Sequence, residues 1–251
     1  MNEGVVKKIL YGDGMHDDTE IIQKMLDNGG YVYLPAGKYL VTRPLIIHSN
    51  THFCMDNTTT LKLADGANCS ILDNDGLYND TVNENITVEG GIWDGNNLAQ
   101  QRKKIPNEGK AGDENEDKDC DKEIYISNVY LVLMLRFIHV KGLTLKNLTL
   151  KDPTSFAVQI ADADTFTVEN IRLDYNLKNK NMDGIHIQGP ARFGYMFTAT
   201  NRRTTSTPSP PIARDGSSRL AHATSGRNPR PLQPARPFTT TLTLTVSMPK
   251  A

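Results

Sequence analysis

The chain has 251 residues, a formal net charge of −1 and 7% aromatic residues, an ordinary composition for a globular protein of one large domain or two small ones. No apolar run is long enough for a membrane span, and the first eight residues (MNEGVVKK) lack the apolar core of a signal peptide. A cytoplasmic protein without membrane contact is therefore expected, unless the true start lies upstream.

The near-zero net charge combines an acidic body with a basic tail. Up to Arg192 there are 20 Lys+Arg and 28 Asp+Glu, whereas from Phe193 onward there are 8 Lys+Arg and one acid, Asp215. Eight of the 13 prolines also fall in that last stretch. This composition predicts a disordered tail from about residue 196. The tail lacks interleaved aromatic residues and any recognised nucleic-acid motif, so no nucleic-acid partner is expected.

The three cysteines, Cys54, Cys69 and Cys120, are odd in number and far apart in the sequence. Their spacing is not that of a metal site, and an odd number does not suit a disulfide framework. Buried free thiols are therefore expected, and neither a metal nor a cofactor is predicted.

A short helix is expected after the turn-rich segment YGDGMHDDT (residues 11–19). Asp18 or Thr19 can cap its N-terminus, and the segment NGG (28–30) ends it. The apolar face of this helix comprises Ile21, Ile22, Met25 and Leu26.

Short strands then recur with little sign of further helix. Most alternate apolar and polar residues over three positions, which is the period of a strand with one buried face. The expected strands are residues 31–34, 39–42, 45–48, 60–63, 86–88, 92–93, 143–145, 148–150, 158–160, 166–168, 171–173 and 185–187.

Two of these segments form an internal repeat. LTLKNLTL (143–150) aligns without gaps on FTVENIRL (166–173) at an offset of 23 residues, and ITVEGGI (86–92) is a degenerate copy. A period in the twenties made only of strands and turns is typical of a β-solenoid with parallel sheets. Asn147 and Asn170 then occupy equivalent turns, where their side chains can bond along the stack. A β-sandwich is the alternative, but it favours hairpin turns and needs no in-phase repeat.

The predicted domain is a β-solenoid over residues 1–195, followed by the tail at 196–251. Residues 98–123 are polar and charged, which indicates a loop inserted into the solenoid, either solvated or gripping a substrate. The proline-rich segments 202–211 and 227–237 cannot form solenoid strands, because proline lacks the N–H that a β-ladder requires.

Four segments together resemble a known family: YGDG with DDT (11–19), VYLPAGKY (32–39), GIWDGN (91–96) and NMDGI (181–185). Over residues 10–195 the chain looks like the polygalacturonase-like pectinases of glycoside hydrolase family 28. The first two segments are shared with other β-helix proteins, including pectate lyase-like and phage tailspike folds, and so indicate the fold only. The last two point more specifically to the hydrolases.

The resemblance implies an all-β fold, a right-handed parallel β-helix that is truncated here. It also implies hydrolysis of galacturonide or rhamnogalacturonide linkages with inversion, on an acidic, pectin-derived oligo- or polysaccharide. The first catalytic motif of the family, Asn-Thr-Asp, maps onto Asn181 and the catalytic Asp183, with Met182 in place of Thr. His186 stands where many members carry Asp.

One carboxylate is not enough for that chemistry. Inverting hydrolysis needs a carboxylic acid and a carboxylate about 6.5–9.5 Å apart, on opposite sides of the scissile bond. The family supplies the others from an Asp-Asp pair on the next coil, and adds a Gly-His-Gly histidine and an Arg-x-Lys pair. After Asp183 this sequence contains none of these motifs, and its only later acid is Asp215. Little or no activity is therefore predicted for this chain.

The abrupt change in composition leads to a hypothesis that the reading frame was lost between about Tyr195 and Arg203. One permitted codon choice for residues 203–212, read in a neighbouring frame, contains an Asp-Asp pair that resembles the missing motif. The last coil would then lack a partner, leaving an open sheet edge.

The candidate substrate-binding residues each have a second interpretation. Asp183 and Gly184 can form a simple turn between strands. His186 faces a groove or makes a structural hydrogen bond, Trp93 stacks on a sugar or fills the core, and Asp94 lines a cleft or forms a turn. With Asn181, they complete the predicted site.

Three other functions stay open: a carbohydrate-binding or tailspike-like β-helix, a Ca²⁺-dependent polysaccharide lyase, and a purely structural protein. The exact glycan, the exo or endo mode and the oligomeric state do not follow from the sequence.

Overall fold

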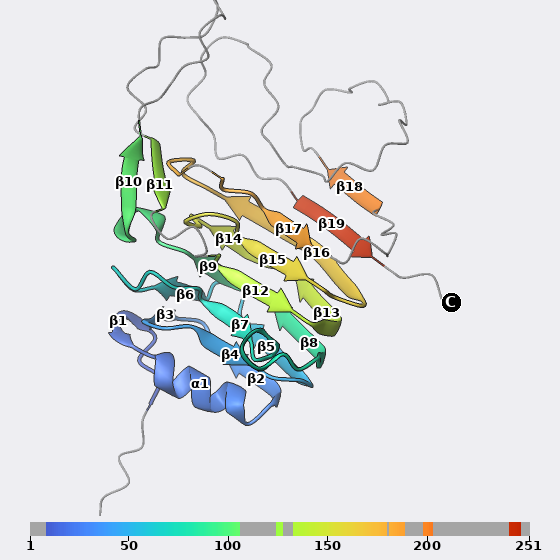
Figure 1. Ribbon diagram of the computed structural model, residues 1–251. Coiled ribbons are helices and arrows are strands. Elements are labelled where there is room, and N and C mark those ends of the chain that lie inside the picture. The colour runs from blue at the N-terminus through green and yellow to red at the C-terminus, as the bar shows by residue number, and fades with distance from the viewer. Residues whose placement is uncertain are drawn as a thin grey trace, which may run out of the picture.

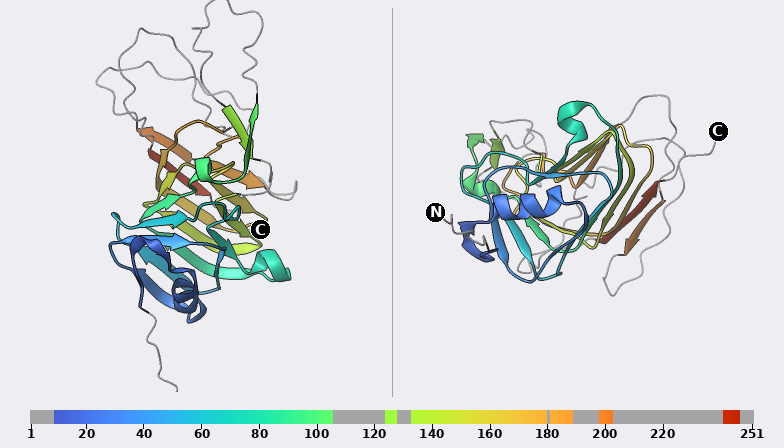
Figure 2. Two further views of the ribbon diagram at one scale, coloured as in Figure 1. Left: turned by 90° about the vertical axis from the view of Figure 1, so that its left-hand side faces the viewer. Right: turned by 90° about the horizontal axis from the view of Figure 1, so that it is seen from below.

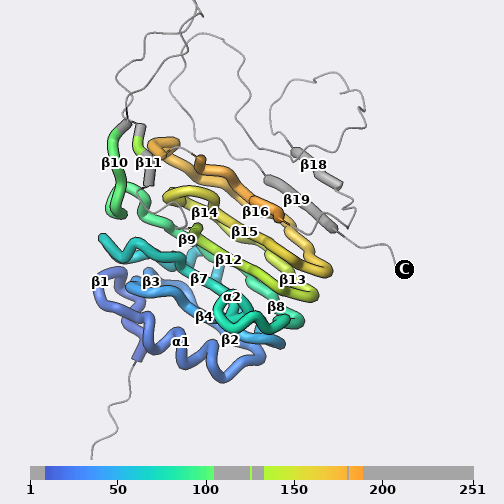
Figure 3. The backbone as a smooth tube through the Cα atoms, in the orientation of Figure 1, coloured from blue at the N-terminus to red at the C-terminus, as the bar shows by residue number. Residues whose placement is uncertain are grey.

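A computed structural model describes residues 9–105, 124–127, 133–179, 181–188, 198–202 and 241–246. They form a parallel β-helix, in which successive coils lie on one another and add strands to the same sheets (Figures 1 and 3). The described helices are α1 (Thr19–Asp27), α2 (Gly76–Asn79) and the 3-10 turn η1 (Asn97–Ala99). None of them is long and apolar enough to cross a membrane.

The strands of the coils form two stacks and one separate sheet. The first stack contains β2 (Gly30–Leu34), β5 (Thr51–Met55), β8 (Asn83–Glu89), β13 (Val140–Lys146) and the first half of β16 (Phe166–Asp174). The second stack contains β1 (Asp13–Asp17), β3 (Lys38–Val41), β6 (Thr60–Leu63), β9 (Ile92–Asp94), β14 (Thr149–Lys151) and the second half of β16. The third sheet contains β4 (Leu45–Ile47), β7 (Leu72–Asn74), β12 (Leu135–Ile138), β15 (Val158–Ala161) and β17 (Ile185–Gln188).

The predicted repeat is the coil of this β-helix. Leu143 pairs with Phe166 and Leu145 with Val168 in a parallel ladder, which is the offset of 23 residues seen in the sequence. The degenerate copy also pairs in register, since Ile86 lies opposite Leu143. The prediction of a parallel solenoid is confirmed, and the β-sandwich is excluded.

The predicted asparagine stack also forms. Asn147 and Asn170 both adopt left-handed backbone conformations, with φ of 61° and 51°. The Nδ2 of Asn170 donates to the Oδ1 of Asn147 over 2.8 Å. Asparagine tolerates this conformation better than most residues because its short polar side chain bonds locally.

Apolar side chains stack in columns along the axis. Val32, Phe53, Val88, Leu145 and Val168 lie opposite one another in adjacent coils and are almost fully buried. Burying this much apolar surface is the main favourable term in the free energy of folding.

Helix α1 lies across the N-terminal end of the solenoid (Figure 2). Ile22 and Leu26 of its predicted apolar face are fully buried. Asp18 occupies the N-cap position but makes no side-chain capping bond. Its carboxylate instead accepts hydrogen bonds from the backbone N–H groups of Tyr11 (2.7 Å) and Gly12 (3.1 Å), so the predicted capping role is replaced by the fixing of the preceding turn.

The predicted insertion begins and ends in a two-stranded antiparallel hairpin, β10 (Arg102–Ile105) with β11 (Ile124–Ser127). Residues 106–123 lie outside the described residues. Cys54 and Cys69 are free thiols, as expected, but both are partly exposed rather than buried. Cys120 lies outside the described residues.

Two segments of the predicted tail are strands, β18 (Thr198–Arg202) and β19 (Thr241–Val246). β19 pairs antiparallel with both β16 and β18. The edge of β16, expected to be open, therefore has a hydrogen-bonded neighbour. The remainder of the tail lies outside the described residues, as do residues 195–197 and 203 of the segment in which frame loss is predicted.

Adjacent coils approach each other closely at Gly90, and substitution of this glycine tests that contact. A Cβ at this position would lie 2.1 Å from the backbone oxygen of Met55, whereas one at Gly66 would meet nothing within 4 Å. Both glycines have positive φ, 78° and 69°. We expect Gly66→Ala to cost about 1–2 kcal/mol for the left-handed backbone. Gly90→Ala should cost about 1–3 kcal/mol more, because the backbone must move. Urea unfolding measures both, and equal losses would contradict the predicted clash.

His48 ties the helix to the coils, and its contribution depends on pH. Its Nε2 lies 3.2 Å from Asp27 Oδ1 and its Nδ1 lies 3.0 Å from Asp75 Oδ2. Burial lowers the pKa of His48, but the bonds to Asp75 and Asp27 outweigh it, and the pKa is raised.

A raised pKa in the folded state means that protonated His48 stabilises the protein below its ordinary pKa of about 6.5, and that this is lost as the pH rises through the folded-state pKa. We expect His48→Gln to destabilise the protein more at about pH 5.5 than at about pH 8. Thermal unfolding at the two pH values measures this, and a loss that does not change with pH would contradict it.

Candidate functional site

Asp183 lies just before β17, at the end of the loop that leaves β16. It is partly buried, and its backbone oxygen accepts a hydrogen bond from Ala157 N at 2.9 Å. The charge of Asp183 acts on the buried phenol of Tyr175. Burial first, and then the charges of Asp183 and Asp152, raise the pKa of Tyr175. Tyr175 is therefore a neutral group on which the Asp183 carboxylate acts electrostatically.

A network of amides holds the loop that precedes Asp183. The side chains of Asn97 and Asn176 bond to each other, with Asn176 Nδ2 donating to Asn97 Oδ1 over 2.8 Å. Asn97 Nδ2 also lies 3.2 Å from Pro153 O and 3.9 Å from Met182 Sδ. The loop around Asp183 is thus fixed to the two preceding coils. Hydrogen bonds of this kind, made behind a functional group, hold that group in place.

The outward side of the third sheet carries a row of polar residues that ends at His186, three residues after Asp183. The parallel register places Asp73 opposite Arg136, Arg136 opposite Gln159, and Gln159 opposite His186. The ring of His186 stacks on Phe156, with centroids 4.5 Å apart and planes at 21°. We call Phe156, Gln159 and His186, together with Asp183, the third-sheet site.

The far end of the row is a buried ion pair. Arg136 Nε and Nη2 lie 2.8 and 2.5 Å from the two carboxylate oxygens of Asp73, whose side chain is fully buried. Ser70 and Tyr78 also donate to Asp73. Burial and the hydrogen bond to Asp73 raise the pKa of Tyr78 to about 12. Because Asp73 is fully engaged, it is a structural group and not a free carboxylate.

The structure brings together three of the predicted residues. Asn181, Asp183 and His186 lie within one loop and the strand that follows it. Asn181 is exposed and has a left-handed backbone conformation, with φ of 58°. Trp93 and Asp94 lie on β9, in the second stack.

The prediction that Trp93 stacks on a sugar is wrong. Trp93 is fully buried, its Nε1 donates to Gly90 O at 3.1 Å, and its ring lies edge-on to Phe53 at 5.8 Å. It points inward because it stands between Leu61 and Leu150 in the column of the second stack. The core interpretation holds.

Asp94 does not line an open cleft either. Its exposed fraction is 6%; Lys151 Nζ lies 2.7 Å from its Oδ2, and Asn96 N donates to its Oδ1 over 2.9 Å. The carboxylate is engaged by an ion pair and a turn, as the alternative interpretation of Asp94 requires.

Two features of the site were missed in the sequence. Gln159 in VQI holds the same place as His186 in IHI, so aligning these two triplets would have found it. The hairpin base also reaches the site loop, since Tyr125 N donates to Lys178 O over 2.7 Å. Arg102 lies 4.5 Å over the Tyr125 ring. No local sequence pattern predicts that contact.

Two family models match the chain. "Rhamnogalacturonase A/epimerase, pectate lyase-like" matches residues 6–118, and "Glycosyl hydrolases family 28" matches residues 81–192.

Among curated proteins, the plasmin and fibronectin-binding protein A of Streptococcus pneumoniae is 30% identical over 179 residues, which are 64% of this chain and 22% of that protein. The preneck appendage protein of Bacillus phage PZA is 33% identical over 90 residues, 34% of this chain and 10% of that protein. The chain thus spans less than a quarter of the length of either relative.

Among solved structures, a putative glycosyl hydrolase from Parabacteroides merdae matches with a TM-score of 0.50 and 18% identity. The match covers 71% of this chain and 76% of that one. At this identity the match supports the β-helix fold alone.

The Asp73–Arg136 pair should be essential to the stability of the third sheet. We expect Arg136→Met to cost about 3–5 kcal/mol, because it leaves the fully buried Asp73 carboxylate without a cation. Lys24→Met removes the exposed pair with Glu20, and should cost no more than about 1 kcal/mol. Urea unfolding of both variants measures the difference. A loss in Arg136→Met as small as the loss in Lys24→Met would show that the buried pair is not needed.

Proposed function

We propose that this chain, whose β-helix is that of a glycoside hydrolase family 28-like member of the pectate lyase superfamily, binds an acidic, pectin-type glycan at the third-sheet site. Asp183 is then one carboxylate of a site for inverting hydrolysis of galacturonide-type linkages. The observation that carries the proposal is the position of Asp183, partly exposed on the loop that leads into β17, three residues before His186 at the end of an outward row of polar and aromatic side chains.

The chemistry of this row suits a sugar chain. The Gln159 amide offers donors and acceptors for hydroxyl groups, and the stacked rings of Phe156 and His186 offer an aromatic surface beside a polar nitrogen. A few polar groups at an apolar surface are what orient a ligand. The hairpin of β10 and β11, fixed to Lys178, stands beside the same loop.

The proposed hydrolysis lacks a second available carboxylate among the described residues of the site. Asp152 acts on Tyr175 together with Asp183, and burial raises the pKa of Asp152. However, its Oδ1 accepts a hydrogen bond from Asn176 N over 2.7 Å, which fixes the turn. Inverting hydrolysis needs both an acid and a base, so this chain should bind the glycan with little or no turnover.

The test combines calorimetry with oligogalacturonate and an assay of reducing ends released from polygalacturonate. We expect binding without turnover in the wild type. His186→Ala should weaken binding about tenfold, equivalent to about 1.4 kcal/mol. Asp183→Asn should leave binding within about twofold, because the row stays intact. Thr144→Ala, on the outward side of the first stack, is the matched control and should bind as the wild type does.

Equal weakening by His186→Ala and Thr144→Ala would contradict the assignment of the third-sheet site. Turnover that disappears in Asp183→Asn would contradict the predicted inactivity while supporting the hydrolase assignment. Turnover that stops with chelator and yields an ultraviolet-absorbing product would indicate a lyase instead.

A second candidate function is adhesion without catalysis. Its support is the 30% identity to a protein named for binding plasmin and fibronectin. Under this proposal the chain binds a host protein and not a glycan. Binding of immobilised fibronectin, combined with no binding of oligogalacturonate, would favour it over the first proposal.

A further inference from the structure

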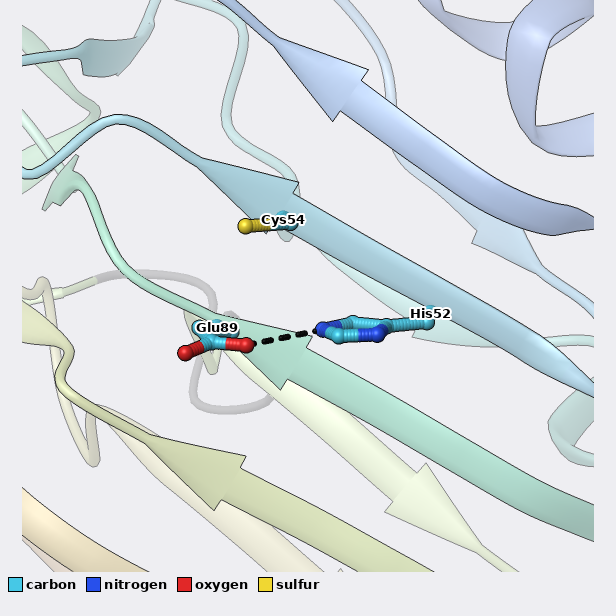
Figure 4. A group of neighbouring side chains, drawn as sticks. All are labelled: His52, Cys54 and Glu89. Atoms are coloured by element: carbon cyan, nitrogen blue, oxygen red, sulfur yellow. Dashed lines mark hydrogen bonds and ion pairs between the residues drawn. The ribbon is translucent and has the colours of Figure 1, made fainter.

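Three side chains with metal-binding atoms meet on the outward side of the first stack, away from the third-sheet site. His52 and Cys54 are two residues apart on β5 and so point to the same side of the sheet. Glu89 on β8 lies directly opposite Cys54 in the parallel register. Figure 4 shows the three side chains on these two neighbouring strands, with the ring of His52 pointing toward Glu89.

The distances between these groups suit a common cation. His52 Nε2 lies 2.9 Å from Glu89 Oε2. One ligand atom from each residue, the Cys54 sulfur included, lies within 4.8 Å of the others. Around a tetrahedral zinc ion, with bonds of about 2.0–2.3 Å, the ligand atoms stand roughly 3–4 Å apart. Binding one ion with all three atoms therefore requires the side chains to rotate toward one another.

The strands beneath the cluster are rigid. Phe53, between His52 and Cys54, and Val88, before Glu89, are both fully buried in the core. Each pairs with the other across the ladder. Sites built on such packed strands hold their ligands more precisely than sites on loops.

We propose that His52, Cys54 and Glu89 form a binding site for a zinc ion, with the fourth position open to water or another ligand. A thiolate and an imidazole select a borderline-soft transition metal over Ca²⁺ or Mg²⁺, which prefer oxygen ligands only. Three protein ligands with one open position is the arrangement of zinc sites that accept an exogenous ligand. On binding, the thiol proton of Cys54 passes to solvent and a sulfur–zinc bond forms.

Two neighbours tune this site. The ring of Tyr31 lies edge-on to His52, with centroids 5.1 Å apart and planes at 84°, and so packs against its imidazole. Lys146 Nζ lies 3.0 Å from the Oε2 of Glu89, the oxygen that also faces His52. The ammonium group competes with a cation for this oxygen and repels it. Lys146 therefore weakens zinc binding, and its removal should strengthen it.

This proposal does not depend on the proposed function, because the three residues lie on the first stack, away from the third-sheet site, and the site needs no glycan. It also departs from the sequence prediction of no metal, which considered only the spacing of the cysteines. In the sequence, the His-x-Cys pair on a strand is the pattern that indicates this site. Glu89 is placed next to the pair only by the parallel register between β5 and β8.

The experiment titrates the full chain with Zn²⁺ by calorimetry and with Co²⁺ by absorption spectroscopy. The starting protein carries Cys69→Ser and Cys120→Ser, which leaves Cys54 as its only thiol. We expect one bound ion per chain and a thiolate-to-cobalt charge-transfer band. In this background, His52→Ala, Cys54→Ser and Glu89→Gln should each weaken Zn²⁺ binding at least about tenfold, and Cys54→Ser should abolish the band.

Two further variants separate ligation from folding. Lys146→Met should tighten Zn²⁺ binding several-fold, a gain that a misfolded protein does not produce. His139→Ala alters a partly exposed histidine that also pairs with carboxylates, Asp80 and Asp162, and should leave the affinity unchanged. A Co²⁺ complex without the thiolate band would overturn the proposal, as would unchanged zinc affinity in Cys54→Ser and Glu89→Gln.

Discussion

The structure depends on the parallel register between coils, which places each inward side chain on its counterpart in the next coil. The column from Val32 through Phe53 and Val88 to Leu145 is continuous because every ladder keeps the same register. A slip of one residue would turn each of these side chains outward and expose the column. The apolar core therefore specifies the register, and the register positions everything else.

The same register organises the outward residues. Since side chains alternate along each strand, a fixed register lines up polar residues from distant segments into rows on the surface. One row runs from Asp73 to His186 on the third sheet, and another brings Cys54 to Glu89 on the first stack. Both proposed sites are consequences of packing on the other side of the sheet.

The two sites differ in what supports them. The loop at Asp183 is held by hydrogen bonds between the side-chain amides of Asn97 and Asn176, and its carboxylate acts electrostatically on the neutral phenol of Tyr175. Under the proposed function, that arrangement supplies one carboxylate without a partner, so glycan binding is expected without catalysis. At the cluster on β5 and β8, the ligand types already suffice for a metal, and the charge of Lys146 sets how tightly it is held.

Local sequence determined much of the fold. Three features depend only on neighbours along the chain or on a constant spacing in the sequence. They are the repeat of 23 residues, the turns at Asn147 and Asn170, and the short helix that begins at residue 19. The motif at Asn181 to Ile185 likewise marked the loop that carries Asp183.

Tertiary structure alone decided which partner each side chain meets, because the coils differ in length. Val88 and Leu145 are adjacent in space although a hairpin insertion separates them in sequence. The inward direction of Trp93, the pairing of Asp94 with Lys151 and the meeting of Cys54 with Glu89 all follow from that spatial register. The sequence pattern alone does not specify this register, because the length of the loop between two strands does not determine which of their residues pair.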